Sequence, residues 1–195
     1  MVEGGKIDWA CHNNDGATMV NEVMDFSDAV EVVLDFYHQH PDETLVIVTA
    51  DHETGGVGLG TRGYDLNLKL LSYQQNSLDV LSERLVSLRE KRGGKVRWEE
   101  VKTVLSEEDV LKSEFECSYL QAGAVLRGLY AVVEPLAKQA VQLLNNKAGI
   151  GWTTPEHTGT QVPVYAIGAG AWRFDGSPLN NTDIPRIIAE SAGWD

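Results

Sequence analysis

The chain has 195 residues, 43% of them hydrophobic, which is enough to bury a core as one domain or as one domain with an insertion. Its net charge of −13 argues against nucleic acid or an anionic membrane as a partner, because both require clustered Lys and Arg. An anionic substrate would therefore have to be met by a local positive centre such as a bound metal ion.

The first part of the chain predicts a helix followed by a strand. Apolar residues recur at helical spacing from Asp25 to Tyr37, with Asp25 or Ser27 as the N-cap, and this helix must end before Pro41. Residues 44–50 are a β-branched run without alternation, as expected of a strand covered on both faces in a parallel sheet. Helix and buried strand together are half of a βαβ unit.

The middle of the chain, residues 61–150, is mostly helix-forming and reads as an insertion. Ser77 is expected to cap a helix with leucines on one face, and residues 98–105 predict a short helix. A longer helix is predicted at 120–144, where Pro135 forces a kink or a division into two. We interpret these leucine faces as packing surfaces.

The end of the chain returns to the α/β pattern. A strand is predicted at 161–167, before the glycine-rich stretch GAGAW, and Thr182 or Asp183 opens a closing helix that ends near Gly193. The expected organisation is a first core segment, the helical insertion and a second core segment, at residues 1–60, 61–150 and 151–195.

Two features bear on the class of protein. Cys11 and Cys117 lie far apart, so a disulfide is possible, but there is no disulfide framework and no CxxC motif. No stretch reaches the roughly 18 apolar residues of a membrane span, and no basic region followed by an apolar stretch opens the chain. The sequence as given shows no export signal.

Acidic and histidine side chains gather where strands are expected to end, which is where open α/β sheets bind ligands. Glu3 follows a possible strand end formed by the first two residues, and Asp8 and His12 stand four apart, on one face if this segment is helical. Asp51 and His52 are adjacent at the tip of the strand predicted at 44–50.

A further histidine, His157, comes just before the strand predicted at 161–167. Carboxylates and imidazoles suit Zn²⁺, and a catalytic zinc ion usually takes three protein ligands, so Asp8, His12 and His157 would satisfy one ion.

Each candidate has a simpler interpretation. His157 alone would more often be a surface or hydrogen-bonded histidine, and Asp51 with His52 could merely cap the next turn. His38 and His40 lie in the last turn of a predicted helix, where a favourable dipole contact accounts for them, and we assign them no chemistry.

The combination of these segments resembles the alkaline phosphatase family. VEGGKID followed by His12 is similar to that family's E-G-x-x-I-D-x-x-x-H segment, and VIVTADHETGG is similar to its signature strand. EHTG resembles the segment of its final zinc histidine, and NNTDIPRIIAE resembles the entry to its C-terminal helix. The resemblance covers Met1 to about Gly60 and Gly151 to the end, whereas the middle is similar to the variable crown insertion only in position and character.

The resemblance implies an α/β fold in which a parallel-rich sheet is flanked by helices and carries a crown-like helical insertion, here as a partial domain. It also implies three metal sites, held by Asp8, His12 and His157 for one zinc ion, by Asp51 and His52 for a second, and by Glu3 for magnesium. Trp9 would lie near the substrate, at a position that in relatives can be a Lys or His, so a cation would be missing there.

The family's serine nucleophile, in a D-S-A type segment, has no counterpart in this sequence. Ser27, Ser77, Ser113 and Ser118 all lack that context, and neither the second zinc nor the magnesium has a full ligand set. The resemblance therefore implies a C-terminal portion of a metal-dependent phosphomonoester hydrolase with a phosphoserine intermediate, and this chain alone is expected to be inactive.

Two other functions stay open at this point. One is a non-catalytic metal-binding or scaffold domain, and the other is a related phosphodiesterase, phosphomutase or sulfatase, although TADHETGG together with EHTG favours the monoesterase. The resemblance further implies a periplasmic or secreted setting and, as in many relatives, a homodimer. Without further strands, the run 44–50 would have unpaired edges, which favours association.

Overall fold

The computed structural model describes residues 1–61, 63–106, 134–176 and 178–194. Contacts divide the chain into two units. Unit 1 comprises Met1–Glu3, Met24–Glu53 and His157–Asp195, and unit 2 comprises Gly4–Val23 and Thr54–Glu156. The predicted insertion, residues 61–150, therefore falls within unit 2, together with residues 4–23 from the start of the chain.

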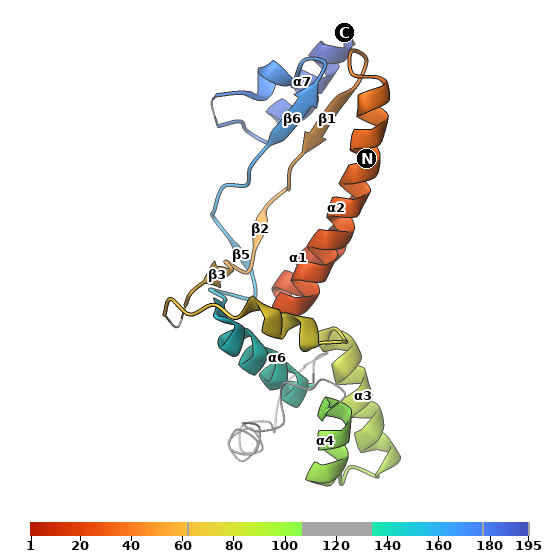
Figure 1. Cartoon of the computed structure of the whole chain (residues 1–195), viewed down its shortest axis with the longest axis vertical. Coiled ribbons are helices and arrows are strands. Elements are labelled where there is room, and N and C mark those ends of the chain that lie inside the picture. Colours follow the sequence, from red (N-terminus) through yellow and green to blue (C-terminus); the bar gives the residue numbers. More distant parts are fainter. Residues whose placement is uncertain (62, 107–133, 177, 195) are drawn as a thin grey trace. The chain divides into compact units, whose positions relative to one another are not determined.

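The elements follow the predicted α/β class (Figure 1). The described helices are α1 (Gly5–His12), α2 (Gly16–Gln39), α3 (Leu78–Lys91), α4 (Trp98–Ser106), α6 (Pro135–Ala148) and α7 (Asp183–Ala192), with 3₁₀ turns η1 (Leu68–Tyr73) and η3 (Ala171–Phe174). The described strands are β1 (Leu45–Val48), β2 (Glu53–Thr54), β3 (Gly58–Leu59), β4 (Ile150–Gly151), β5 (His157–Thr158) and β6 (Tyr165–Gly168). Among these helices, none is both long enough and apolar enough to cross a bilayer.

Unit 1 is organised by the pairing of β1 with β6, which lie side by side (Figure 1). The strands are antiparallel, with Leu45 opposite Gly168 and Val48 opposite Tyr165. Gly168 has a φ of +99°, and a Cβ at this position would lie 2.0 Å from the carbonyl oxygen of Thr44. Only glycine allows this approach, after which the Ala169 N–H donates to the same oxygen at 2.9 Å.

The parallel environment predicted for residues 44–50 is wrong for this pair of strands. The ladders of known register, β1 with β6 and β3 with β4, are both antiparallel. Full coverage of both faces is also wrong, since Val46 is the only buried residue of β1 and Tyr165 of β6 is 65% exposed. An apolar run specifies that a strand forms, but strand direction depends on a partner that lies more than 100 residues away.

The start of the chain differs from expectation as well. Residues 1–4 have irregular backbone instead of the strand end expected of Met1 and Val2. Two extended residues form a strand only when a neighbouring strand supplies hydrogen bonds, and no described strand pairs with them.

Helix α2 begins at Gly16, nine residues before the predicted start at Asp25, and ends at Gln39 before Pro41 as predicted. The cap is Asp15, whose carboxylate accepts hydrogen bonds from the Thr18 N–H at 3.1 Å and the Thr18 hydroxyl at 2.7 Å. Asp15 is only 1% exposed, and it also accepts from Gln74 Nε2 at 2.9 Å and from the Leu78 N–H at 2.8 Å. One buried carboxylate therefore joins the starts of α2 and α3.

In unit 2, helices α3, α4 and α6 pack around a leucine-rich core, as their sequence faces predict. Its buried members are Leu78, Leu81, Leu85, Val101, Leu105, Leu136, Ala137, Ala140 and Val141. Ser77 caps α3 as predicted, accepting from the Val80 N–H at 3.3 Å. A second cluster, Ala17, Leu71, Leu144, Ala148 and Ile150, joins α2 to α6 and β4.

Of the predicted helix 120–144, the described part is helix α6, which begins at Pro135. Glu134 caps this helix by accepting from the Leu136 N–H at 2.7 Å and the Ala137 N–H at 3.1 Å, and it forms an ion pair with Arg89 of α3. The first part of the predicted helix, and Cys117 with its possible disulfide to the buried Cys11, lie outside the described residues.

The closing helix α7 starts at Asp183 and is followed by Gly193 in the left-handed conformation, as predicted. A side-chain hydrogen bond from Arg186, and then one from the Asn180 N–H, lower the pKa of Asp183. Because this pKa is lowered on folding, the contribution of the carboxylate to stability is present at neutral pH and is lost as the pH falls through the lowered value.

Unit 1 has an apolar groove of about 280 Å³ between α2 and β1, with Phe26, Val33 and Ile47 among the residues that line it. Helix α2 adds further exposed apolar side chains, of which Val32 is 70% exposed and Phe36 56%. The groove and these side chains, together the α2 apolar surface, have no covering segment among the described residues of unit 1.

The buried cap at Asp15 generates a stability prediction. We expect Asp15→Ala to lower the free energy of unfolding by about 3 kcal/mol or more, because the N–H of Leu78 and the amide of Gln74 would lose a charged acceptor inside the protein. Urea denaturation measures this loss. Asp25→Ala is the matched control, since Asp25 is an exposed aspartate of the same helix, and a similar loss in both variants would contradict the cap.

Candidate metal centre

Helix α1 presents the first pair of predicted ligands on one face. His12 Nε2 lies 3.4 Å from Asp8 Oδ1, one turn away, and both side chains are about one-third exposed. His12 Nδ1 lies 2.6 Å from the carbonyl oxygen of Pro155, which can only accept, so Nδ1 carries the proton. In the neutral ring, Nε2 then turns its lone pair toward a carboxylate, an arrangement that favours a cation between the two groups.

Thr54 fixes the orientation of the Asp8 carboxylate. Its hydroxyl donates to Asp8 Oδ1 at 2.5 Å, and the residue is 9% exposed. The chain then turns through Gly55, which has a φ of +88° and lies so close to Trp152 that a Cβ would come within 2.6 Å of the indole ring. Sequence reasoning missed Thr54, although its place directly after the Asp-His-Glu run was a usable signal.

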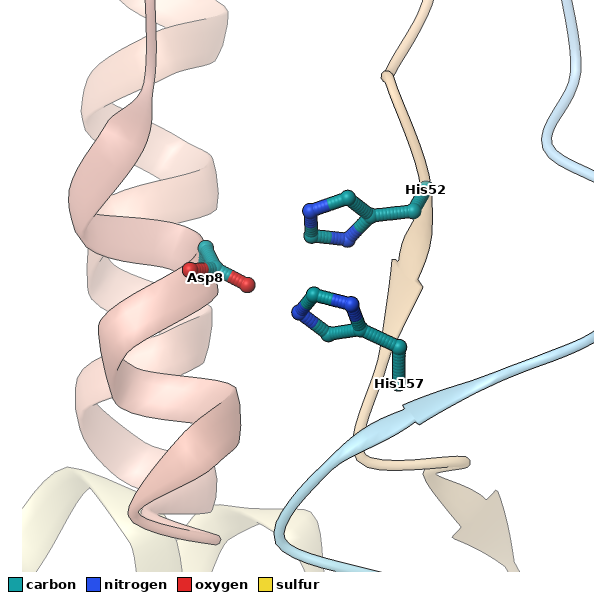
Figure 2. A group of neighbouring side chains, drawn as sticks. All are labelled: Asp8, His52 and His157. Carbon is teal, nitrogen blue, oxygen red and sulfur yellow. The ribbon is translucent and has the colours of Figure 1, made fainter.

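Unit 1 supplies a pair of histidines, which Figure 2 shows side by side. The rings of His52 and His157 are stacked, with 3.6 Å between centroids and 24° between planes. His52 directly precedes β2 and His157 opens β5. Two residues that are distant in the sequence therefore present imidazoles at one place.

Asp51 accompanies this pair. One of its carboxylate oxygens lies 3.4 Å from His52 Nε2 and the other accepts the His52 N–H at 3.2 Å, while its side chain is 87% exposed. The two predicted ligands of the second zinc are therefore neighbours in space as well as in sequence, and Asp51 has most of its surface toward solvent.

The remaining predicted residues are placed as follows. Asp8 and His12 belong to unit 2 and His157 to unit 1, so the predicted set for the first zinc falls in two halves that the structure describes separately. Figure 2 also labels Asp8, on α1. Glu3, the predicted magnesium ligand, is exposed in unit 1, and Trp9 is 67% exposed on α1.

The donors present fit zinc. Imidazole nitrogen and carboxylate oxygen bind Zn²⁺ at about 2.0–2.2 Å. The ligand atoms of His52 and His157 lie within 4.8 Å of each other, a separation that one ion, or two neighbouring ions, can span. The facing lone pair and carboxylate of His12 and Asp8 fit the same chemistry.

Comparison with known proteins gives a consistent result. The family model for alkaline phosphatase matches residues 1–194. The chain is 34% identical to Alkaline phosphatase 4 of Bacillus subtilis over 96% of its own length and 38% of that protein's. It is 32% identical to the repressible alkaline phosphatase of Saccharomyces cerevisiae, over 85% of the chain and 30% of the yeast protein.

Solved structures agree with the sequence relatives. A cold-active alkaline phosphatase from Shewanella superposes with a TM-score of 0.74 at 32% identity, covering 97% of this chain and 44% of that one. The Thermus thermophilus alkaline phosphatase, at 23% identity and a TM-score of 0.72, shares the fold, with 100% of this chain and 43% of that one covered. The chain thus spans less than half of the relatives it matches.

The family model matches residues 1–194, a range that includes the stacked histidines and the paired side chains of α1. The chain belongs to the alkaline phosphatase family.

Proposed function

We propose that this chain is the portion of a phosphomonoester hydrolase that supplies most of its zinc ligands. The observation that carries the proposal is the stacking of His52 on His157 at 3.6 Å, in a chain of the alkaline phosphatase family. Two stacked imidazoles, one just before a short strand and one at the start of another, are uncommon in a packed core but suit a metal centre.

The proposed metals are two zinc ions and one magnesium ion. Asp8, His12 and His157 would bind the first zinc, Asp51 and His52 the second, and Glu3 would contribute to magnesium. Two metal ions about 4 Å apart can activate an attacking oxygen and stabilise a leaving one in phosphoryl transfer. Neither the second zinc nor the magnesium has a full ligand set here, so further ligands would come from chain outside these residues.

The protein groups would orient the donors. Thr54 holds the Asp8 carboxylate and the Pro155 carbonyl fixes the protonated nitrogen of His12, so that Nε2 is the donor atom. Trp9, the residue after Asp8, offers an exposed indole without the cation that a Lys would provide. With a net charge of −13 on the chain, the metal ions would have to attract the phosphate themselves.

The proposal includes a serine nucleophile, a phosphoserine intermediate and a phosphomonoester as the substrate. The nucleophile would come from outside these residues, because no serine of this sequence has the family's context. A periplasmic or secreted setting and a homodimer are further parts of the proposal, and both rest on the family resemblance.

The metal assignment predicts the effect of one substitution. We expect titration calorimetry of the chain with Zn²⁺ to show a tight site that His157→Ala weakens strongly but leaves measurable, because one of its three protein ligands would be lost. His38→Ala is the matched control, since His38 is an exposed histidine of α2, and its affinity is expected to stay unchanged. Equal affinity in all three proteins would contradict the assignment, as would the absence of zinc binding by the folded wild-type chain.

The missing nucleophile predicts the activity of the isolated chain. With Zn²⁺ and Mg²⁺ present, we expect no hydrolysis of p-nitrophenyl phosphate above the rate of a His12→Ala variant, because the metal ligands alone provide no serine to phosphorylate. Release of nitrophenolate measures this rate. Turnover by the wild-type chain that His12→Ala abolishes would show that the 195 residues form a complete active site.

A further inference from the structure

A second link joins the two segments that carry the stacked histidines. One residue beyond His52, the Glu53 carboxylate accepts a hydrogen bond from the hydroxyl of Thr158, which is one residue beyond His157. The two residues are 105 positions apart in the sequence, and both lie in unit 1. Each segment therefore contributes a histidine to the stack and the next side chain to a hydrogen bond.

The hydroxyl of Thr158 is fixed in direction. A carboxylate only accepts, so the single hydroxyl hydrogen of Thr158 points to Glu53. Thr160 approaches the same oxygen from its own segment, with its hydroxyl at 3.1 Å and its N–H donating at 3.4 Å. The Thr158 hydroxyl thus contacts Thr160 on its own segment and donates its hydrogen to Glu53 on the other segment.

The link adds to other contacts between the two segments, such as the Gly55 N–H, which donates to the Glu156 carbonyl oxygen at 2.9 Å. Strands β2 and β5 have two residues each, so their ladder is short. Stacking alone is also weak between two polar rings, and it would be opposed by repulsion if each ring bound its own metal ion. A charge-assisted hydrogen bond is roughly twice as strong as a neutral one and depends on direction.

We propose that Glu53 and Thr158 are positioning residues, whose hydrogen bond keeps the imidazoles of His52 and His157 side by side so that both can bind metal. The metal-binding part rests on the proposed function, whereas the alignment of the rings does not. The residues act through the backbone of their neighbours, and neither is a metal ligand.

The test compares three variants of the 195-residue chain in two measurements. Thr158→Val removes the hydroxyl at nearly constant shape, Thr158→Ser keeps it, and Glu53→Gln removes the charge of the acceptor. The first measurement is the nuclear Overhauser effect between the rings of His52 and His157 in metal-free protein. The second is zinc affinity by calorimetry, together with the visible spectrum of the Co²⁺ form, which reports the geometry of the ligands.

We expect Thr158→Val to lose the ring contact and to bind zinc at least 10-fold more weakly, in the range of about 10- to 100-fold typical when a group that orients a ligand is removed. Thr158→Ser should restore both, and Glu53→Gln should fall between. Glu156→Gln is the matched control, because Glu156 is an exposed carboxylate directly before His157, and it should leave both measurements unchanged.

A cycle with His157→Ala separates positioning from general stability. If Thr158 acts through the histidine pair, Thr158→Val causes no further loss of zinc affinity once His157 is absent. An additional loss of the same size would overturn the proposal, and so would a ring contact that persists in Thr158→Val. Should Thr158→Val not fold, Glu53→Gln takes its place in the cycle.

The outcomes also separate this inference from the proposed function. If Thr158→Val loses the ring contact and the wild-type chain binds no zinc, the positioning role is supported and the metal centre is contradicted. If the wild-type chain binds zinc and Thr158→Val binds it with the same affinity, the metal centre is supported and the positioning role is contradicted.

Discussion

The antiparallel pairing of β1 with β6 is the contact on which the candidate metal centre in unit 1 depends. It joins segments more than 100 residues apart, and closing so long a loop has an entropic cost that the ladder and its packing must offset. The close approach of Gly168 to the Thr44 carbonyl fixes the register, and a slip by one residue would reverse the direction of each side chain. The pairing also brings His52 and His157 together, because His52 follows β1 in the sequence and His157 precedes β6.

In unit 2, the helical stretch supports the ligands of α1 instead of forming a separate appendage. The buried side chain of Asn145 on α6 donates to the Asn14 carbonyl at 2.7 Å and accepts from the Gly16 N–H at 3.2 Å, so it holds the turn between α1 and α2. Asp15 connects the same turn to α3. The orientation of Asp8 and His12 thus depends on residues far along the chain, and α6 reinforces this through the cluster that Leu144 and Ala148 form with Ala17 of α2.

Sequence reasoning succeeded where the signal is local. The shared face of Asp8 and His12, the Ser77 cap and the end of α7 before Gly193 each depend on neighbouring residues, and the structure confirms them. It failed where a distant partner decides. The start of α2 requires Asp15 to be buried by Gln74 and Leu78, the direction of β1 is set by β6, and the bond between Glu53 and Thr158 has no signature in either segment. Metal-ligand residue types could be recognised, but the groups that orient them could not.

The α2 apolar surface has a consequence for how the protein behaves in solution. A net charge of −13 makes copies of the chain repel one another, and this repulsion keeps exposed side chains such as Val32 and Phe36 from meeting. At an ionic strength of 0.15 M, the Debye length is only about 8 Å, so charges on two copies are largely screened from each other. Attraction between apolar surfaces is not screened in this way, and kosmotropic salts such as sulfate strengthen it. Colloidal stability is therefore expected to be greatest in dilute buffer, and the α2 apolar surface is one place through which copies would associate at high salt.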